Sequence, residues 1–283
     1  MNLSCFSLEI DARIATLTMT RAAEMNTITP AMWRELEQVA DWLQREAPAR
    51  VLVIASTGKH FSAGLALEAF SGDLPIDDHD AVGRAGLALT IADMQRALER
   101  IAALRMPVIA AVQGGCIGGG VDLVSACDMR FATADAFFCI QEINVGLAAD
   151  LGTLQRLPKL IPDGIVRELA YSGRRMPASR ALAVGLVNEV FPDQAAMLAG
   201  VRELAAEIAS KPPLAVWASK QAIDYARDHP VAEGLRQMTW LQAGMWDTSA
   251  VVESLAAKRE QRAPSYPDQG RMRSFTDTGE DRS

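Results

Sequence analysis

Residues 106–121 are the longest stretch of this chain without a charged side chain, and their internal order limits the folds that the chain can adopt. The stretch begins with Pro107–Val112, a continuous apolar segment typical of a strand that is buried on both faces of a sheet. Five glycines follow between Gly114 and Gly120, and the next residues, 121–126, are mostly apolar. The stretch is too short to cross a membrane as a helix, so we expect a strand, a tight turn and a helix of an α/β domain.

Strand and helix patterns alternate on both sides of this stretch. Period-two alternation and short apolar runs predict further strands at 7–10, 13–19, 50–55, 129–132, 136–140 and 186–191. Helical spacing of apolar residues predicts helices at 30–44, after the cap signal Thr29-Pro30, and at 81–104. The C-terminal part is predicted to be wholly helical, with helices at 194–210, 213–227, 231–245 and 249–261. This order favours an α/β layered domain followed by helices.

Composition excludes several classes of partner. The 283 residues include 28 Lys and Arg against 35 Asp and Glu, a formal net charge of −7. Because nucleic acids and anionic membranes both attract basic surfaces, we expect neither as a partner. The four cysteines form no CxxC pair and are predicted to be small buried side chains. The N-terminal sequence shows no targeting pattern, so we expect a cytoplasmic protein.

The glycine-rich turn at 114–120 is the first candidate for function. It contains no GxGxxG pattern, and Gly58-Lys59 is not part of a P-loop because His60 follows and the upstream glycine is missing. Bare backbone N–H groups at the start of a helix could bind an anion or a developing oxyanion. The alternative is a tight turn that needs glycine only for its backbone angles. The number of glycines favours the functional interpretation.

Hydrolytic and metal-dependent sites are not indicated. The segment 60–64 (HFSAG) partly resembles a nucleophile elbow, but a histidine stands where GxSxG requires glycine. The three histidines, at positions 60, 79 and 229, lack the spacing of a catalytic triad or a metal site. We therefore expect them at the surface and predict no metal ion.

Three acidic residues have more informative surroundings. Asp122 lies on the apolar helix after the turn, where a buried carboxylate is costly unless it has a partner. It is either a structural carboxylate bound by backbone donors or a catalytic group. Glu142, taken alone, is typical of a solvated loop acid. Asp150, taken alone, is best explained as the N-cap of a following helix.

Three segments together resemble the crotonase, or enoyl-CoA hydratase/isomerase, superfamily. They are 114–128 (GGCIGGGVDLVSACD), 141–158 (QEINVGLAADLGTLQRLP) and 61–67 (FSAGLAL). The resemblance extends to about residue 262 and, within the superfamily, is greatest to the Δ3,5-Δ2,4-dienoyl-CoA isomerases. It implies an α/β fold built as a spiral of ββα units with a helical C-terminal trimerisation region. It also implies acyl-CoA thioester substrates and no cofactor apart from the CoA of the substrate.

The resemblance sets the predicted domain organisation. Residues 1–192 would form the ββα spiral that binds acyl-CoA and carries out catalysis, and residues 193–262 the helical oligomerisation region. That region carries Trp217, Trp240 and Trp246, and apolar surface of this extent is often buried between subunits. We therefore expect a homotrimer or a hexamer. Residues 263–283 are polar and predicted to be a flexible tail.

Carried over by position, the resemblance implies an oxyanion hole made by the backbone N–H groups of Leu65 and Gly119. The thioester oxygen would bind there. Residues beside these two are expected to contact the substrate; they are Ala63, Gly64, Ala66, Leu67 and Gly118.

Two positions depart from the family pattern. The segment 21–26 (RAAEMN) lacks the basic, proline-containing sequence that often precedes the asparagine, and Ala66 stands where an Asp is common. Contacts to the phosphates and adenine of CoA are therefore less well defined. Arg21 and Lys59 are the candidates for phosphate contact, with solvated surface charges as the alternative.

The resemblance also assigns roles to the acids. Asp122 and Glu142 match two acidic positions of the family, and Asp150 matches an additional acid of the dienoyl-CoA isomerases. Moving a 3,5-diene to a 2,4-diene removes a proton from C2 and adds one at C6, so two separate groups suit the reaction. The implied roles are Glu142 at C2, Asp150 at C6, and Asp122 as a group that orients or tunes Glu142. An apolar pocket would have to raise their pKa values.

We therefore predict an enzyme that isomerises 3,5-dienoyl-CoA to 2,4-dienoyl-CoA in unsaturated fatty-acid β-oxidation or a related pathway. Hydration of 2-enoyl-CoA by Asp122 and Glu142 is the alternative enzymatic function. A non-enzymatic subunit that binds a CoA thioester is an alternative of another class. It is disfavoured because a scaffold has no reason to maintain costly acids in an apolar environment.

Overall fold

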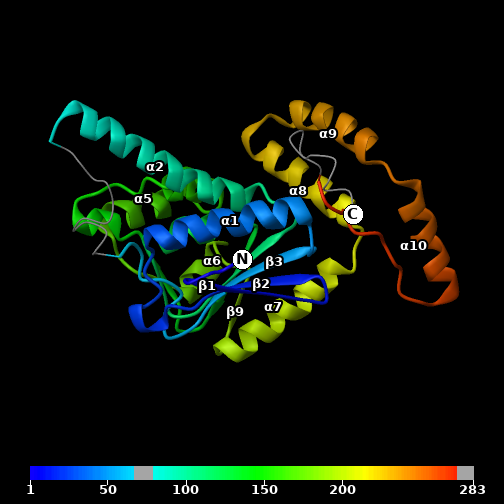
Figure 1. Ribbon diagram of the computed structural model, residues 1–283, viewed down its shortest axis with the longest axis horizontal. Coiled ribbons are helices and arrows are strands. Elements are labelled where there is room, and N and C mark those ends of the chain that lie inside the picture. The colour runs from blue at the N-terminus through cyan, green and yellow to red at the C-terminus, as the bar shows by residue number, and fades with distance from the viewer. Residues whose placement is uncertain (67–78, 273–283) are drawn as a thin grey trace.

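The computed structural model describes residues 1–66 and 79–272, and its main sheet has six strands (Figure 1). In spatial order they are β1 (Phe6–Asp11), β2 (Ile14–Met19), β3 (Val51–Ser56), β4 (Val108–Val112), β6 (Met129–Thr133) and β9 (Glu189–Phe191). β1 and β2 form an antiparallel hairpin, and the other neighbouring strands are parallel. The strands predicted for this sheet are confirmed, although β9 is shorter than the predicted segment.

Helices cover both faces of this sheet, which explains why its central strands are continuously apolar. The helices α1 (Pro30–Glu46) and α2 (Ala81–Ala102) lie over one face, and α7 (Gln194–Ala209) lies over the other (Figure 1). Successive residues of β3 alternate between two apolar clusters, with Leu52 on the α1 side and Val53 on the α7 side. Every residue of β3 and β4 is buried, as expected for parallel strands between helical layers.

The first helix starts where the sequence signal lies. Thr29 is the N-cap of α1, and its hydroxyl accepts a hydrogen bond from the Met32 N–H at 3.4 Å. Pro30 occupies the first turn, where no N–H is needed. The side chains predicted to line the core face, such as Leu36 and Leu43, are buried.

A second, three-stranded sheet carries the glycine-rich segment. Its strands, in spatial order, are β5 (Gly115–Ile117), β7 (Phe137–Cys139) and β8 (Met176–Pro177). β5 lies within the segment that the sequence predicts to be a turn, because its residues pair in parallel with β7. The predicted apolar helix follows as α3 (Gly119–Ser125). The chain turns at Gly114 and Gly118, which flank β5 and have φ +56° and +51°, and Gly118 serves as the N-cap of α3.

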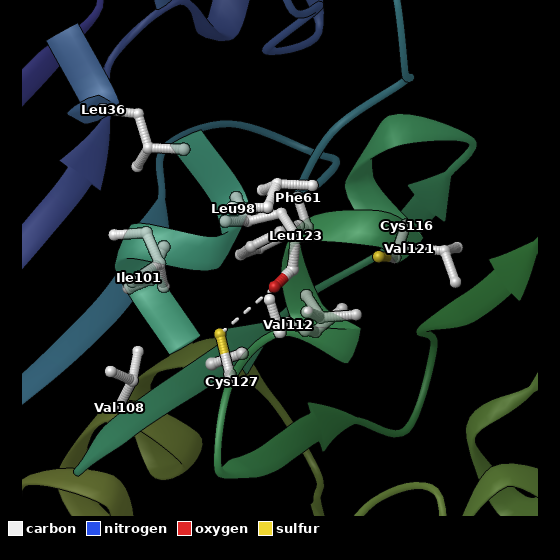
Figure 2. Packing of buried hydrophobic residues seen from close by; sticks show 14 of the residues in the cluster. Leu36, Phe61, Leu98, Ile101, Val108, Val112, Cys116, Val121, Leu123 and Cys127 are labelled. Carbon is white, nitrogen blue, oxygen red and sulfur yellow. Dashed lines mark hydrogen bonds between the residues drawn. The ribbon is translucent and has the colours of Figure 1, made fainter. Parts of the chain in front are cut away.

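Figure 2 shows how α3 packs against α2. Leu123 and Cys127 belong to one apolar cluster with Leu98 and Ile101 of α2. The Cys127 thiol donates a hydrogen bond to the Leu123 carbonyl oxygen at 3.4 Å (Figure 2). All four cysteines are free and buried, as predicted. Burial raises the pKa of the Cys127 thiol to about 12, which makes it unreactive.

Short helices connect the remaining elements. Beyond β7 they are η3 (Glu142–Val145), α4 (Thr153–Arg156), η4 (Leu157–Lys159), α5 (Asp163–Ser172) and α6 (Ala178–Ala183). A 3-10 helix, η1 (Ala22–Glu24), follows the first hairpin. The helices η3 and α4 carry or adjoin the candidate site acids.

The C-terminal helices extend away from the sheet at one end of the molecule (Figure 1). They are α8 (Pro213–Asp228), α9 (Val231–Met245) and α10 (Thr248–Glu260), which confirms the predicted helical part. All residues of α9 lie within the described ranges, and none of them is buried. None of the helices within the described ranges is long and apolar enough to span a membrane.

Residues 263–272 return to the body, although the sequence predicts a flexible tail from residue 263 onward. Arg50 donates from Nη2 to the Tyr266 carbonyl oxygen at 2.6 Å and from Nε to the Asp268 carboxylate at 2.7 Å. The Met272 N–H donates to the Arg45 carbonyl oxygen at 2.8 Å. The described part of the predicted tail is thus docked, because buried Arg50 needs these acceptors. Residues 273–283 lie outside the described ranges.

Candidate active site

The candidate active site lies where two glycine-containing segments run side by side. The first is segment 62–66 and the second is β5. Ser62 pairs with Cys116 in an isolated parallel bridge. Gly64 approaches the second segment so closely that a Cβ placed on it would lie 2.9 Å from the Ile117 carbonyl oxygen. Gly64 also has φ +86°, so a side chain is excluded for two reasons. The contact brings segment 62–66 against the end of β5.

Two backbone N–H groups at this junction have no protein acceptor among the described residues; they belong to Leu65 and Gly119. Ile28 hydrogen-bonds to both neighbours of Leu65, through the Gly64 carbonyl at 2.8 Å and the Ala66 N–H at 3.0 Å. In a parallel ladder this pattern directs the Leu65 N–H away from Ile28. Gly119 is the first residue of α3, where an N–H has no partner within the helix.

Asp122 is held inside the molecule by a backbone donor. Asp122 is 1% exposed, and its Oδ1 accepts a hydrogen bond from the Thr153 N–H at 2.7 Å. Burial raises the pKa of Asp122, and hydrogen bonding from Thr153 opposes this rise. The charge of Asp150 raises the pKa further, while Arg156 lowers it. The backbone partner expected for a structural carboxylate is therefore present, and it ties α3 to the loop that carries Asp150.

Glu142 lies against the glycine-rich turn. A Cβ placed on Gly118 would be 3.0 Å from its Oε1 atom. Its Oε2 atom is buried and accepts no hydrogen bond from the part of the chain that the structure describes. Burial raises the pKa of Glu142 to about 7, and the charges of Asp122 and Asp150 also act in this direction. The solvated loop acid predicted from Glu142 alone is therefore wrong, because its side chain is turned inward while the rest of η3 is exposed.

Asp150 does not cap a helix. The next helix, α4, starts at Thr153, and its N-cap is Gly152 with no side-chain cap. The predicted cap is wrong because Gly152, with φ 123°, turns the chain between Asp150 and α4. Ala149 and Leu151 are buried on either side of the exposed Asp150, and Asp150 is among the residues that line a cleft of about 700 Å³ beside α2. Partial desolvation raises its pKa.

The structure brings Asp122, Glu142 and Asp150 within electrostatic range of one another. Like charges at short range oppose simultaneous ionisation, so one acid can hold a proton while another is ionised. This combination suits acid–base chemistry at two positions of one substrate. In residues 1–66 and 79–272, no three His, Cys, Asp or Glu side chains are arranged to hold a metal ion.

The two predicted phosphate contacts belong to neighbouring segments. A Cβ placed on Gly58 would lie close to the Ala22 side chain, which brings Arg21 and Lys59 onto adjacent stretches of chain. Lys59 is exposed, and the Nε of partly buried Arg21 has no hydrogen-bond partner among the described residues. Lys59 is therefore accessible to an anionic group, whereas the Arg21 Nε atom is itself buried.

His60 is half-buried rather than at the surface, contrary to the prediction. Its Nδ1 accepts a hydrogen bond from the Gly115 N–H at 2.9 Å, and its ring contacts the Phe137 ring edge-on. Burial lowers the pKa of His60, as do the positive charges of Lys59 and Arg175. The imidazole is thus kept neutral as an acceptor for β5. The other two histidines are exposed, as predicted.

Buried polar residues that the sequence analysis did not single out hold the two segments in place. Ser62 donates from Oγ to the Asn26 carbonyl oxygen at 2.8 Å and accepts the Gly64 N–H at 3.2 Å. Gln113 donates to the Ser56 hydroxyl at 2.8 Å. Gln113 is a polar residue directly after an apolar run. Asp122 was singled out because it is a polar residue in an apolar stretch, and the same signal could have identified Gln113.

The remaining predicted substrate contacts lie along segment 63–67. Ala63 is partly exposed and Ala66 is buried. Leu67 lies outside the described residues.

Comparisons with known proteins identify relatives of the chain. The model of the enoyl-CoA hydratase/isomerase family matches residues 9–269. The chain is 44% identical over 247 residues to the mitochondrial Delta(3,5)-Delta(2,4)-dienoyl-CoA isomerase of Homo sapiens, which covers 86% of this chain and 75% of that protein. The peroxisomal Delta(3,5)-Delta(2,4)-dienoyl-CoA isomerase of Arabidopsis thaliana is 34% identical over 259 residues, which covers 90% and 93%.

Solved structures show the same fold. An enoyl-CoA hydratase from Bacillus anthracis matches with a TM-score of 0.85 at 29% identity, covering 93% of this chain and 99% of that one. The expected α/β architecture with a helical C-terminal region is therefore confirmed. The chain belongs to the enoyl-CoA hydratase/isomerase family.

Proposed function

We propose that the protein is a dienoyl-CoA isomerase that converts 3,5-dienoyl-CoA into 2,4-dienoyl-CoA in the breakdown of unsaturated fatty acids. The names of its relatives support this activity. The observation that carries the proposal is the position of Glu142, whose carboxylate lies against Gly118 and whose pKa is raised to about 7. A base with such a pKa is well matched to proton transfer near neutral pH.

The thioester oxygen would bind the backbone N–H groups of Leu65 and Gly119. Neither group has a protein acceptor among the described residues, and their segments meet at Gly64. When C2 loses its proton, negative charge develops on the thioester oxygen, and preorganised donors stabilise that charge. Loss of one such donor typically raises the barrier by about 3 kcal/mol. Ala63, Ala66 and Gly118 flank these donors and would contact the bound substrate.

Two acids would move the protons. Glu142 takes the proton from C2, the double bonds shift to C2–C3 and C4–C5, and Asp150 gives a proton to C6. Exchange with solvent then returns both carboxyl groups to their starting states. Because like charges oppose simultaneous ionisation, the two acids together retain one proton more readily than isolated carboxyl groups would. The proposed reaction starts from the state in which that proton is on Asp150 and Glu142 is ionised.

Asp122 would act on Glu142 without touching the substrate. Its charge contributes to the raised pKa of Glu142, and its hydrogen bond to the Thr153 N–H holds the following loop. This role fits its burial, since a residue that is 1% exposed has little access to a substrate.

The CoA phosphates would bind beside segment 58–60. Arg21 and Lys59 lie on adjacent segments there. Arg175, which stacks on Phe137 at 4.4 Å, adds a third cation close to His60. Together, these cations near segment 58–60 could attract a polyanionic group without a generally basic surface.

The C-terminal helices would assemble the protein into a homotrimer or a hexamer. Trp240 is 79% exposed and Trp246 is 64% exposed, and valine and leucine side chains of α9 and α10 are exposed beside them in the sequence. An apolar surface of this kind is stabilised when a second subunit covers it. The need for no separate cofactor and a cytoplasmic location stay predictions from the sequence.

Hydration of a 2-enoyl-CoA is the second candidate, since the structural relative is named an enoyl-CoA hydratase. It would require Asp122 and Glu142 to hold one water molecule between them. The engagement of Asp122 Oδ1 by the Thr153 N–H and the deep burial of Asp122 weigh against this function.

The two functions are separated by offering the purified protein 3,5-dienoyl-CoA and 2-enoyl-CoA in separate assays and following ultraviolet absorbance. Formation of the conjugated 2,4-dienoyl thioester would support the isomerase. Loss of the enoyl band would support the hydratase. If neither absorbance changes, the protein is better explained as a non-enzymatic subunit that binds a CoA thioester.

A further inference from the structure

We propose that α2 positions Asp150 through a clamp formed by Gln95, Glu99 and Arg156, and that this clamp sets the efficiency of proton delivery to C6. The three residues are called the α2 clamp below, and residues 149–153 are called the Asp150 loop. The inference rests on the proposed role of Asp150 as the C6 proton donor. Gln95, Glu99 and Arg156 are positioning residues, because they act through the Asp150 loop.

The first contact of the clamp reaches Asp150 itself. The Nε2 of Gln95 donates a hydrogen bond to the Asp150 carbonyl oxygen at 2.6 Å. One helical turn further along α2, Glu99 accepts a hydrogen bond from Arg156 Nη2 at 2.6 Å. Residues four positions apart share a helix face, so both contacts come from the same face of α2.

Arg156 carries the second contact into the loop. Its Nη1 donates to the Leu151 carbonyl oxygen at 3.2 Å. A Cβ placed on Gly152 would collide with the same nitrogen, so the guanidinium is packed directly on the loop backbone. The Arg156 side chain is 14% exposed, although it carries a charge. Glu99 thus partners a largely buried cation that covers the loop next to Asp150.

The other side of the Asp150 loop is fixed by the core. Ala149 and Leu151 are buried, and Asp122 accepts the Thr153 N–H. These anchors hold the residues around Asp150, whereas Gln95 holds the Asp150 peptide group. Without Gln95, the loop keeps its core anchors but its central peptide can rotate, and the carboxyl group moves with it.

The clamp is separate from the contacts of Glu142. Glu142 belongs to η3 and lies against Gly118, and none of the three clamp hydrogen bonds reaches either residue. Misplacement of a reacting group by about 1 Å can lower a rate by about 10²-fold. Loss of the clamp should therefore slow protonation at C6 while leaving proton removal at C2 unchanged.

The test compares two reactions of each protein. The first is isomerisation of 3,5-dienoyl-CoA, followed by ultraviolet absorbance, and the second is exchange of the C2 proton with solvent deuterium. Gln95→Met removes the donor but keeps the side-chain length, and we expect isomerisation to fall about 10- to 100-fold. Glu99→Gln removes the charge opposite Arg156, and we expect a fall of about 3- to 10-fold, of the size of an ordinary hydrogen bond because Glu99 is exposed. C2 exchange should stay within about twofold of wild type in both variants.

The matched control is Asp93→Asn on the same helix. Asp93 pairs with Arg96 at 2.6 Å, but both side chains are more than half exposed and the pair does not contact the Asp150 loop. This variant should behave like wild type in both assays. The C2 exchange reaction also reports whether each variant is folded and binds substrate.

Two results with the variants would overturn the clamp. Wild-type isomerisation by Gln95→Met would show that its hydrogen bond is not needed to position Asp150. An equal loss of C2 exchange and isomerisation would show a general structural role. If the wild-type protein catalyses C2 exchange but no isomerisation, the proposed function fails first and the clamp fails with it.

Discussion

The body of the molecule and its last two helices differ in how their apolar side chains are covered. In the body, every residue of β3 and β4 is buried, and the sheet has a helical layer on each face. In contrast, α9 has no buried residue within its described length, and α10 buries Ala257. The body therefore forms its own core, whereas α9 and α10 present apolar surface that another subunit can cover.

The same division separates the candidate site from the candidate interface. Asp122, Glu142 and Asp150 belong to the body, while Trp240 belongs to α9 and Trp246 directly follows it. Changes in the body should alter chemistry without altering assembly, and changes in α9 should do the reverse.

The largest effect is expected for Glu142→Gln. Loss of a positioned base typically lowers turnover by about 10²-fold or more. The amide has almost the same shape, so acyl-CoA binding and the oligomeric state should be unchanged. Steady-state rates together with sedimentation velocity check both parts. Turnover near the wild-type level would remove Glu142 from the mechanism.

The next effect is expected for Asp150→Asn. Isomerisation should fall by about 10²-fold because the acid at C6 is lost. Exchange of the C2 proton with deuterium should persist, since it needs Glu142 and the oxyanion hole. Asp150 caps no helix in the structure, so the fold has little reason to change. A variant that isomerises the 3,5-diene at the wild-type rate would make the hydratase the better proposal.

A smaller effect, confined to assembly, is expected for Trp240→Asp. An exposed aromatic side chain at the centre of an interface commonly contributes about 2 kcal/mol, so subunit dissociation should increase by about 30-fold. Tyr171→Asp is the control, because Tyr171 is 69% exposed but belongs to α5 of the body. Sedimentation at several protein concentrations measures both. A wild-type protein that is a stable monomer at micromolar concentration contradicts the prediction.

The smallest effect concerns stability and pH. The folded-state pKa of Glu142 is about 7, against an ordinary value of 4.5. Between these values the folded protein keeps a proton that the unfolded chain has lost, so the contribution of Glu142 to the free energy of unfolding falls as pH rises. Glu142→Gln lacks this loss and should be more stable than wild type at pH ~8 by about 1 kcal/mol, because solvent screens the partly exposed carboxyl group.

The stability prediction is checked by urea unfolding of wild type and Glu142→Gln at pH ~5 and ~8. The advantage of the variant should be larger at the higher pH. An equal difference at both pH values would mean that the carboxyl group is not desolvated. It would also remove the main argument for Glu142 as a base that works near neutral pH.

Sequence patterns were most informative where a few neighbouring residues decide the structure. The cap at Thr29, the apolar face of α1 and the buried strand β4 all follow from local spacing. The same reasoning failed at Asp150, because the positive φ of Gly152 delays the start of α4. It also missed β5, since glycine-rich sequence does not show that its backbone pairs with a strand about 20 positions later.

The sequence by itself determined the strands of the main sheet, the long helices and three acids worth testing. The tertiary structure alone decided the surroundings of those acids. The Asp122 bond joins residues 31 positions apart, the Gln95 bond 55 positions, and the docking of Tyr266 on Arg50 216 positions. No local sequence pattern indicates such contacts. Burial and the charges of Asp122 and Asp150 raise the pKa of Glu142, because a carboxyl group responds to whatever lies within a few ångströms of it, wherever that lies in the chain.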